Sequence, residues 1–150
     1  EARMKVGVHS PVSTIKAAIN ASESNRIVIL DAPPGTSCPF IQTVAQADYV
    51  VLVTEPTPFG VSDLKQSVET LKTLGKPCGV IVNRAKLGNL EVYDYLKQEN
   101  IPLLMSIPFD REIASIYSNG RLLTNENTEW QQKFNQLFTS ITTEYGNSRH

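Results

Sequence analysis

The 150-residue sequence lacks both an excess of charge and any long apolar run. Its 14 basic and 15 acidic residues give a net charge of −1, which argues against a nucleic-acid partner and against binding to an anionic membrane surface. The longest apolar runs have four or five residues, too few to span a bilayer or to form the core of a secretory signal. The length suits one domain with a sizeable core, and we expect a single domain over residues 1–150.

Cysteine and histidine are also scarce. The two cysteines, Cys38 and Cys78, lie far apart and in no Cys-x-x-Cys arrangement. They predict a reducing, cytoplasmic setting, and they are too few for this chain alone to hold a metal or iron–sulfur site. His9 has no partner at ligand spacing, and neither Ser37 nor Ser62 lies in a Gly-x-Ser-x-Gly elbow. The sequence therefore gives no support for nucleophilic catalysis.

The sequence does contain a distinctive stretch from Arg26 to Cys38, made of an apolar run, an acid and an abrupt turn. Ile27 to Leu30 is too short for a helix and rich in β-branched residues, so it predicts a central strand of a parallel sheet, buried on both faces. Asp31 ends this strand, and the Pro-Pro-Gly turn that closes at Gly35 can continue neither strand nor helix. Open α/β sheets bind ligands at the carboxyl ends of their strands, so this carboxylate suits a hydrated Mg²⁺ beside a phosphate. The alternative is that Asp31 simply caps a loop.

Strand and helix patterns alternate along the chain, at a spacing typical of a parallel sheet with helices on both faces. Besides the run above, the expected strands are Lys5–His9, Tyr49–Val53 (again fully buried), Cys78–Val82 and Leu103–Ile107. The expected helices open at Ser10-Pro11, run over Pro39–Ala47, Val61–Leu74, Asn89–Glu99 and Arg111–Ser118, and open again at Thr128 with a capping-box pattern to Gln131. An apolar stripe from Trp130 to Ile141 predicts that the last helix docks on the sheet. The predicted fold class is therefore α/β with three layers.

Four strand ends carry distinctive loops, namely Asp31-Ala-Pro-Pro-Gly35, Glu55-Pro-Thr-Pro-Phe-Gly60, Val82-Asn83-Arg84 and Ile107-Pro108-Phe109-Asp110. In this order and at this spacing they resemble the loops of the MinD/ParA-type (deviant Walker) P-loop ATPases. Within that family the chain is most similar to the branch with an inserted ferredoxin domain, whose members resemble the Mrp-type iron–sulfur carrier ATPases. The resemblance runs from about Arg3 to Arg121, and its strength comes from the four motifs in register.

The resemblance implies roles for five residues. Asp31 matches the catalytic acid that ends the Walker B strand and holds Mg²⁺ through water, and Gly35 matches the switch glycine whose backbone senses the γ-phosphate. Asn83 matches the residue that hydrogen-bonds the adenine edge, while Pro108 and Phe109 match the loop beside the base. A side-chain amide offers a donor and an acceptor together, as a purine edge requires, and an apolar loop can stack on the ring. Asn83 could instead be an ordinary strand-end turn residue.

The sequence departs most from the family's pattern at the phosphate-binding loop, which it lacks. The sequence contains no GxxxxGK[ST] and no deviant version of it, and no two of its eight glycines lie within three residues of each other. The family's switch aspartate and ferredoxin cysteines belong to the same missing part. The resemblance therefore implies the C-terminal portion of a P-loop ATPase-like domain, beginning where the insert would end. ATP or ADP, Mg²⁺ and an iron–sulfur cluster would belong to the complete protein, and we expect no ATP hydrolysis by this chain alone.

The missing phosphate-loop strand has a structural consequence, because in the family it lies between the strands that match Ile27–Leu30 and Val50–Val53. We expect an empty slot, direct pairing of these two strands, or a segment supplied by another chain, as in a homodimer. An iron–sulfur or ferredoxin partner is implied as well, and Glu55 either contacts a partner subunit or faces water. The competing hypothesis is a non-catalytic binding module that completes an ATPase or ferredoxin assembly. A flavodoxin-like domain fits less well, because nothing but Thr36-Ser37 resembles its phosphate loop.

Overall fold

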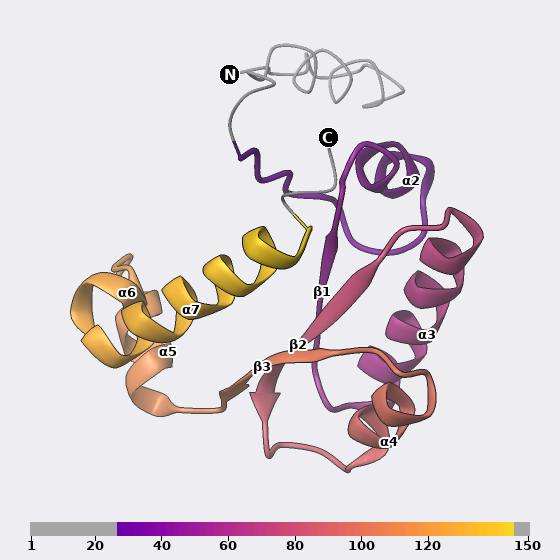
Figure 1. The fold of residues 1–150 in the computed structure, drawn as a ribbon. Coiled ribbons are helices and arrows are strands. Elements are labelled where there is room, and N and C mark those ends of the chain that lie inside the picture. Colours follow the sequence, from indigo (N-terminus) through magenta and orange to yellow (C-terminus); the bar gives the residue numbers. More distant parts are fainter. Residues whose placement is uncertain (1–26, 146–150) are drawn as a thin grey trace, which may run out of the picture.

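The computed structural model describes residues 27–145, which form an open three-stranded parallel sheet with helices (Figure 1). The strands are β1 (Val50–Thr54), β2 (Cys78–Ala85) and β3 (Leu103–Pro108), in the order β1-β2-β3. The helices are α2 (Cys38–Val44), α3 (Pro58–Thr73), α4 (Glu91–Gln98), α5 (Arg111–Ser118), α6 (Leu123–Glu126) and α7 (Thr128–Tyr145). The predicted α/β class is confirmed. The strand predicted at Lys5–His9 and the helix predicted from Ser10-Pro11 lie outside the described residues.

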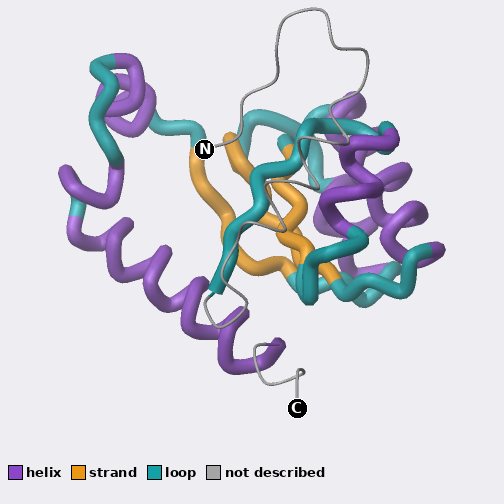
Figure 2. The backbone as a smooth tube through the Cα atoms, turned by 90° about the horizontal axis from the view of Figure 1, so that it is seen from above, coloured by secondary structure: helices purple, strands orange, loops and turns teal. Residues whose placement is uncertain are grey.

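The sheet is arranged around β2, which pairs with a strand on each side. Its pairing with β1 is continuous from Val50↔Cys78 to Thr54↔Val82, whereas its pairing with β3 has two register shifts. Figures 1 and 2 show α3 and α4 on one side of the sheet and α7 on the other. The described residues therefore form the three layers that the sequence predicts.

The main core lies between β2, α3 and α4. Its buried members are Val61, Leu64, Val68, Val80, Val82, Ala85, Val92 and Leu96. The apolar period of α3 predicts its buried face correctly, but the helix begins three residues earlier than expected, at Pro58. The Thr57 side chain accepts a hydrogen bond from the N–H of Gly60, and proline suits the first helical position, so Thr57-Pro58 starts the helix.

A second, smaller cluster joins α2 to β1 and α3. It consists of Phe40, Val44, Val50 and Leu71, with Ala32 among the half-buried residues packed against it. Helix α2 ends at Val44, before the predicted Ala47. The Lys76 ammonium donates to the carbonyl of Ala47 at 2.9 Å, and this hydrogen bond holds the chain just beyond the helix.

The prediction of a buried strand at Ile27–Leu30 is wrong. Residues 27–33 form no strand, and Ile27 and Ile29 are 62% and 83% exposed. Strand β1 is not fully buried either, since Val51 and Val53 are 38% and 64% exposed. The physical reason is the number of neighbours: an apolar run is buried on both faces only where other elements cover it, and among the described residues β1 pairs with β2 alone. Direct pairing of Ile27–Leu30 with β1, one of the three expected outcomes, does not occur among these residues.

Helix α7 starts at the predicted residue but by a different cap. The Asn127 carboxamide oxygen accepts hydrogen bonds from the N–H groups of Glu129 and Trp130, at 3.0 and 3.1 Å, so the predicted box between Thr128 and Gln131 is wrong. Trp130 is buried, but Phe138 is 45% exposed, and a groove of about 420 Å³ remains between β3 and α7. The predicted docking of this helix on the sheet is therefore partial.

Candidate functional site

The carboxyl ends of the three strands are joined to one another by close contacts. The N–H of Phe109, after β3, donates to the carbonyl of Ala85 at the end of β2. After β2, a Cβ added to Gly88 would lie 1.4 Å from the carbonyl oxygen of Pro56, so only glycine permits this approach to the loop after β1. The three loops form one continuous rim (hereafter the rim), which is where open parallel sheets bind ligands.

The loop after β1 is held by its own hydrogen bonds. The Thr54 hydroxyl donates to the carbonyl of Gly60 at 2.9 Å, and the N–H of Gly60 donates to the Thr57 hydroxyl at 3.0 Å. A Cβ on Gly60 would approach the carbonyl oxygen of Glu55 to 2.4 Å. This turn therefore requires glycine at position 60 and fixes the backbone that carries Glu55.

Asn83 lies on a bulge at the end of β2. Val82 pairs with Ser106 and Ala85 with Pro108, so β2 carries one residue more than β3 between these two pairs. A bulge of this kind redirects side chains and is common beside functional sites. Asn83 is half-buried, and its side chain makes no hydrogen bond with another described residue. Within the described residues, its amide donor and acceptor both lack a partner.

The bulge is strained at Arg84, where φ is +50°. A residue other than glycine in this left-handed region costs about 1–2 kcal/mol, and Lys86 two residues later has a φ of +78°. The Arg84 Nε lies 3.4 Å from a carboxylate oxygen of Glu55, so an ion pair links the bulge to the loop after β1. Glu55 thus has an ion-pair partner within the chain, and its side chain remains 38% exposed, so the predicted contact with a partner subunit stays untested.

Pro108 and Phe109 follow on the neighbouring strand. Pro108 is half-buried at the end of β3, and Phe109 is 52% exposed, so an apolar surface lies next to the bulge that carries Asn83. Asp110 has a structural role, because its carboxylate accepts a hydrogen bond from the N–H of Glu112 at 2.7 Å and caps α5. The structure therefore brings together three of the five predicted site residues: Asn83, Pro108 and Phe109.

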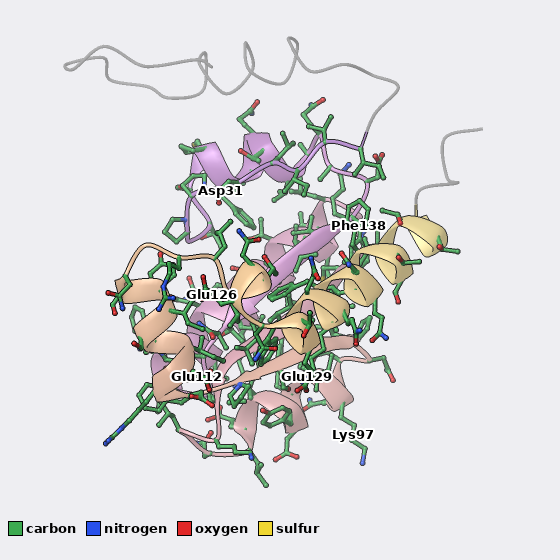
Figure 3. The ribbon with its side chains drawn as sticks, turned by 90° about the vertical axis from the view of Figure 1, so that its left-hand side faces the viewer. Asp31, Lys97, Glu112, Glu126, Glu129 and Phe138 are labelled. Atoms are coloured by element: carbon green, nitrogen blue, oxygen red, sulfur yellow. The ribbon has the colours of Figure 1, made fainter. Side chains whose placement is uncertain are left out.

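Asp31 lies on the extended residues 27–33, and Gly35 lies in the bend between them and α2. Figure 3 shows Asp31 in the upper part of the view, and both Glu112, which follows β3, and Lys97 of α4 in the lower part. Asp31 is exposed and makes no hydrogen bond or ion pair with another described residue. Gly35 has a φ of +81° and open space where a Cβ would be. No hydrogen bond or ion pair among the described residues joins Asp31 or Gly35 to Asn83, so their place in the site stays a prediction.

The carboxylate of Asp31 is a ligand type that suits Mg²⁺, whereas the two cysteines are too few for an iron–sulfur cluster. Mg²⁺ keeps several waters and needs only one or two carboxylates, so a single exposed Asp31 suffices for a water-mediated contact. No group of three or more His, Cys, Asp or Glu side chains gathers within residues 27–143 in a way that could hold a metal ion. An iron–sulfur cluster commonly takes four cysteines, and the whole sequence has two, so this chain alone cannot complete such a site.

Shifted pKa values occur in a group near the start of β2 and at Glu129 on α7, where the hydrogen bond from Lys133 lowers the pKa. Burial raises the pKa of the Cys78 thiol, although the nearby Lys72 ammonium acts in the opposite direction. The hydrogen bond to Glu99 raises the pKa of Lys72, and burial raises that of Tyr95. The shifts of Lys72, Cys78 and Tyr95 accompany packing between α3, β2 and α4.

Sequence reasoning missed the contacts that join the loops. The ion pair joins Glu55 to Arg84, which is 29 positions later in the sequence. Gly88 packs against Pro56, which is 32 positions earlier. No local pattern predicts such contacts. The one available signal was Gly88 itself, since an isolated glycine beside a strand end often marks a close backbone approach.

Comparisons with known proteins find relatives in sequence and a solved structure of similar fold. No protein-family model matches the chain. Two uncharacterized proteins of Methanocaldococcus jannaschii are 34% identical over 100 residues and 29% identical over 115 residues, covering 66% and 75% of this chain. An iron-sulfur cluster carrier protein of Rickettsia typhi is 31% identical over 102 residues, or 65% of this chain. The chain spans only about a third of the length of these curated relatives, at 34%, 38% and 32%.

A solved structure shares the fold. The MinD cell division protein of Aquifex aeolicus matches with a TM-score of 0.56, over 73% of this chain and 49% of that one, at 22% identity. At this identity the likeness shows the fold alone. The chain therefore has a MinD-like α/β fold and a distant relationship to an iron-sulfur cluster carrier protein. None of the described helices has the length and hydropathy that a membrane crossing needs.

Proposed function

We propose that this chain is the Walker B, switch and base-binding part of an ATP–Mg²⁺-binding P-loop ATPase, related to MinD/ParA-type and iron–sulfur carrier ATPases. The observation that carries the proposal is the rim, where Asn83, whose amide has no partner among the described residues, adjoins Pro108 and Phe109 on a MinD-like sheet. The similarity to an iron-sulfur cluster carrier protein supports the narrower branch of the family.

Each site residue has a distinct task in this proposal. The Asn83 amide donates to and accepts from the purine edge, and Pro108 and Phe109 pack beside the ring. Asp31 holds Mg²⁺ through water, and the N–H of Gly35 faces the terminal phosphate. Bound Mg²⁺ supplies neutralisation of phosphate charge. The complete protein would act in the cytoplasm as a homodimer or with an iron–sulfur or ferredoxin partner.

Hydrolysis is not expected of this chain by itself. Phosphoryl transfer depends on positioning and on stabilising charge around the phosphates, and the sequence has no glycine-rich loop with its lysine. The remaining groups bind the base and Mg²⁺ but cannot enclose the phosphates. We therefore expect weak nucleotide binding without turnover.

The open edge of β1 supports the related proposal that another strand pairs there. Val51 and Val53 are exposed on this strand, and the neighbouring residues 27–33 are extended but pair with no described strand. Proteins rarely leave the edge of an apolar strand unpaired and uncovered. The strand comes either from the complete protein or from a partner.

The second candidate function, favoured by the same open edge, is a non-catalytic module that completes an ATPase or ferredoxin assembly. The encoding DNA upstream of Glu1 separates the two. An in-frame glycine-rich loop and a cysteine cluster there support the ATPase portion, and a nearby start codon supports the binding module.

Calorimetric titration with ATP–Mg²⁺ and a phosphate-release assay test the proposed function. We expect weak binding by the wild type, about tenfold weaker binding by Asn83→Ala because a paired amide contact with adenine is lost, and no phosphate release. Asn125→Ala is the matched control, since Asn125 is exposed on α6 and its side chain has no hydrogen-bond partner among the described residues. Phosphate release by the wild-type chain, or equal affinities of Asn83→Ala and Asn125→Ala, would contradict the proposal.

A further inference from the structure

We infer that Glu55 and Arg84 are positioning residues that set the preference of this rim for adenine over guanine, by holding the bulge that carries Asn83. The inference rests on the proposed function and adds to it two residues that touch no base themselves. Its starting point is the backbone strain at Arg84, which lies directly beside the residue proposed to contact the base.

The strained bulge is fixed from both sides. On the β3 side, Ala85 is 5% exposed, pairs with Pro108, and accepts the hydrogen bond from the N–H of Phe109. On the β1 side, the contact with Arg84 is the ion pair to Glu55. A strained backbone conformation persists only where the surrounding structure holds it in place. At Arg84 the backbone pairing of Ala85 provides one restraint, and the ion pair with Glu55 provides the side-chain restraint.

Glu55 is a suitable anchor because its own backbone is fixed. Gly60 admits no side chain next to the carbonyl of Glu55, and the N–H of Thr57 donates to that same carbonyl at 2.8 Å. Gly88 packs against the next residue, Pro56. The carboxylate of Glu55 is therefore presented from a rigid turn, and it restrains the Arg84 side chain relative to that turn.

The direction of the Asn83 amide determines base selectivity. Adenine offers an acceptor next to an amino donor, and guanine reverses part of this pattern with its carbonyl oxygen, so one fixed amide orientation suits only one of them. An amide that rotates freely can adapt to both bases. Releasing Arg84 should thus lower the discrimination between the two bases more than the affinity for nucleotide as such.

Lys86 provides a matched control within the same loop. Like Arg84 it is cationic, exposed and in the left-handed region, but it has no ion pair with a described residue. Glycine relieves the strain at either position. Arg84→Gly and Lys86→Gly therefore differ chiefly in whether the contact with Glu55 is lost.

The experiment uses NMR titrations of the whole 150-residue chain with ATP–Mg²⁺ and with GTP–Mg²⁺, following the Asn83 side-chain amide. In Glu55→Gln and Arg84→Gly we expect this resonance to shift before any nucleotide is added, and the ATP-to-GTP affinity ratio to fall about two- to fivefold, as loss of an exposed ion pair allows. Lys86→Gly should keep both wild-type values. The charge-reversed double variant, Glu55→Arg with Arg84→Glu, should recover most of the ratio.

Three outcomes would overturn the inference, and they have different meanings. If the wild type binds ATP selectively and Glu55→Gln and Arg84→Gly remain equally selective, the positioning role is wrong and the proposed function stands. If Lys86→Gly loses as much selectivity as Arg84→Gly, the ion pair is not the cause. If the wild type responds to neither nucleotide, the proposed function fails, and the positioning role fails with it.

Discussion

Strands β1 and β2 are similar in sequence but differ in burial. Strand β2 pairs on both sides and has helices packed on it, and Val80 and Val82 are fully buried. Strand β1 pairs on one side among the described residues, and Val53 is 64% exposed. Both contain a run of apolar, largely β-branched residues, Val50–Val53 in β1 and Val80–Val82 in β2, so the difference comes from their neighbours rather than from these residues.

The same difference in neighbours explains why apolar residues before β1 are exposed in the part of the chain that the structure describes. The extended residues 27–33 show the same effect more strongly, because Ile29 has the composition of a core residue and is 83% exposed. Apolar side chains on an unpaired edge invite pairing with another strand. The proposal that another strand pairs with β1 would account for this difference, because such a strand would cover the edge that β2 does not pair with.

A pair of identical substitutions measures the difference directly. Val82→Ala should lower the free energy of unfolding by about 2 kcal/mol, because it removes buried methyl groups and leaves a cavity. Val53→Ala should change it by less than about 0.5 kcal/mol, as expected for an exposed side chain. Urea unfolding of both variants provides the values. Equal destabilisation would mean that β1 is covered in solution and that the contrast is wrong.

The two cysteines also differ in burial, although by less than the valines of β1 and β2. Cys38 is exposed at the start of α2, while Cys78 is half-buried at the start of β2, where burial raises its thiol pKa. A raised pKa leaves less thiolate at neutral pH, so iodoacetamide should modify Cys38 about tenfold faster than Cys78. Mass spectrometry over time gives both rates. In urea the two should react alike, and a faster Cys78 in the folded protein would contradict the account.

Local patterns in the sequence predict the central part of the fold well. The apolar period of α3, the inward positions Val92 and Leu96 of α4, and the bounds of α5 all agree with the structure, because each depends on residues within a few turns. The burial of Ile27–Leu30 and of β1 could not be read from the same patterns, since it depends on which other strands are present. The cap of α7 was misassigned by one residue, from Asn127 to Thr128, because both residue types can serve as caps.

The candidate site is likewise predicted in part by local patterns and in part only by tertiary packing. The strand-end rule places Asn83, Pro108 and Phe109 on one rim, and the structure agrees. The bulge at Asn83, the ion pair of Glu55 with Arg84, and the fit of Gly88 against Pro56 arise from tertiary packing, which no local signal specifies. The roles of all five site residues remain predictions.

Hydrogen exchange along β1 tests the central claim most directly. The N–H of Val50 donates to the carbonyl of Pro77, so alternation turns the amides of Val50 and Leu52 toward β2 and those of Val51 and Val53 toward the open edge. We expect the Val51 and Val53 amides to exchange at least about tenfold faster than that of Leu52 in the 150-residue chain. Equal protection of all three amides would mean that β1 already has a second partner, and it would contradict the open slot on which the account depends.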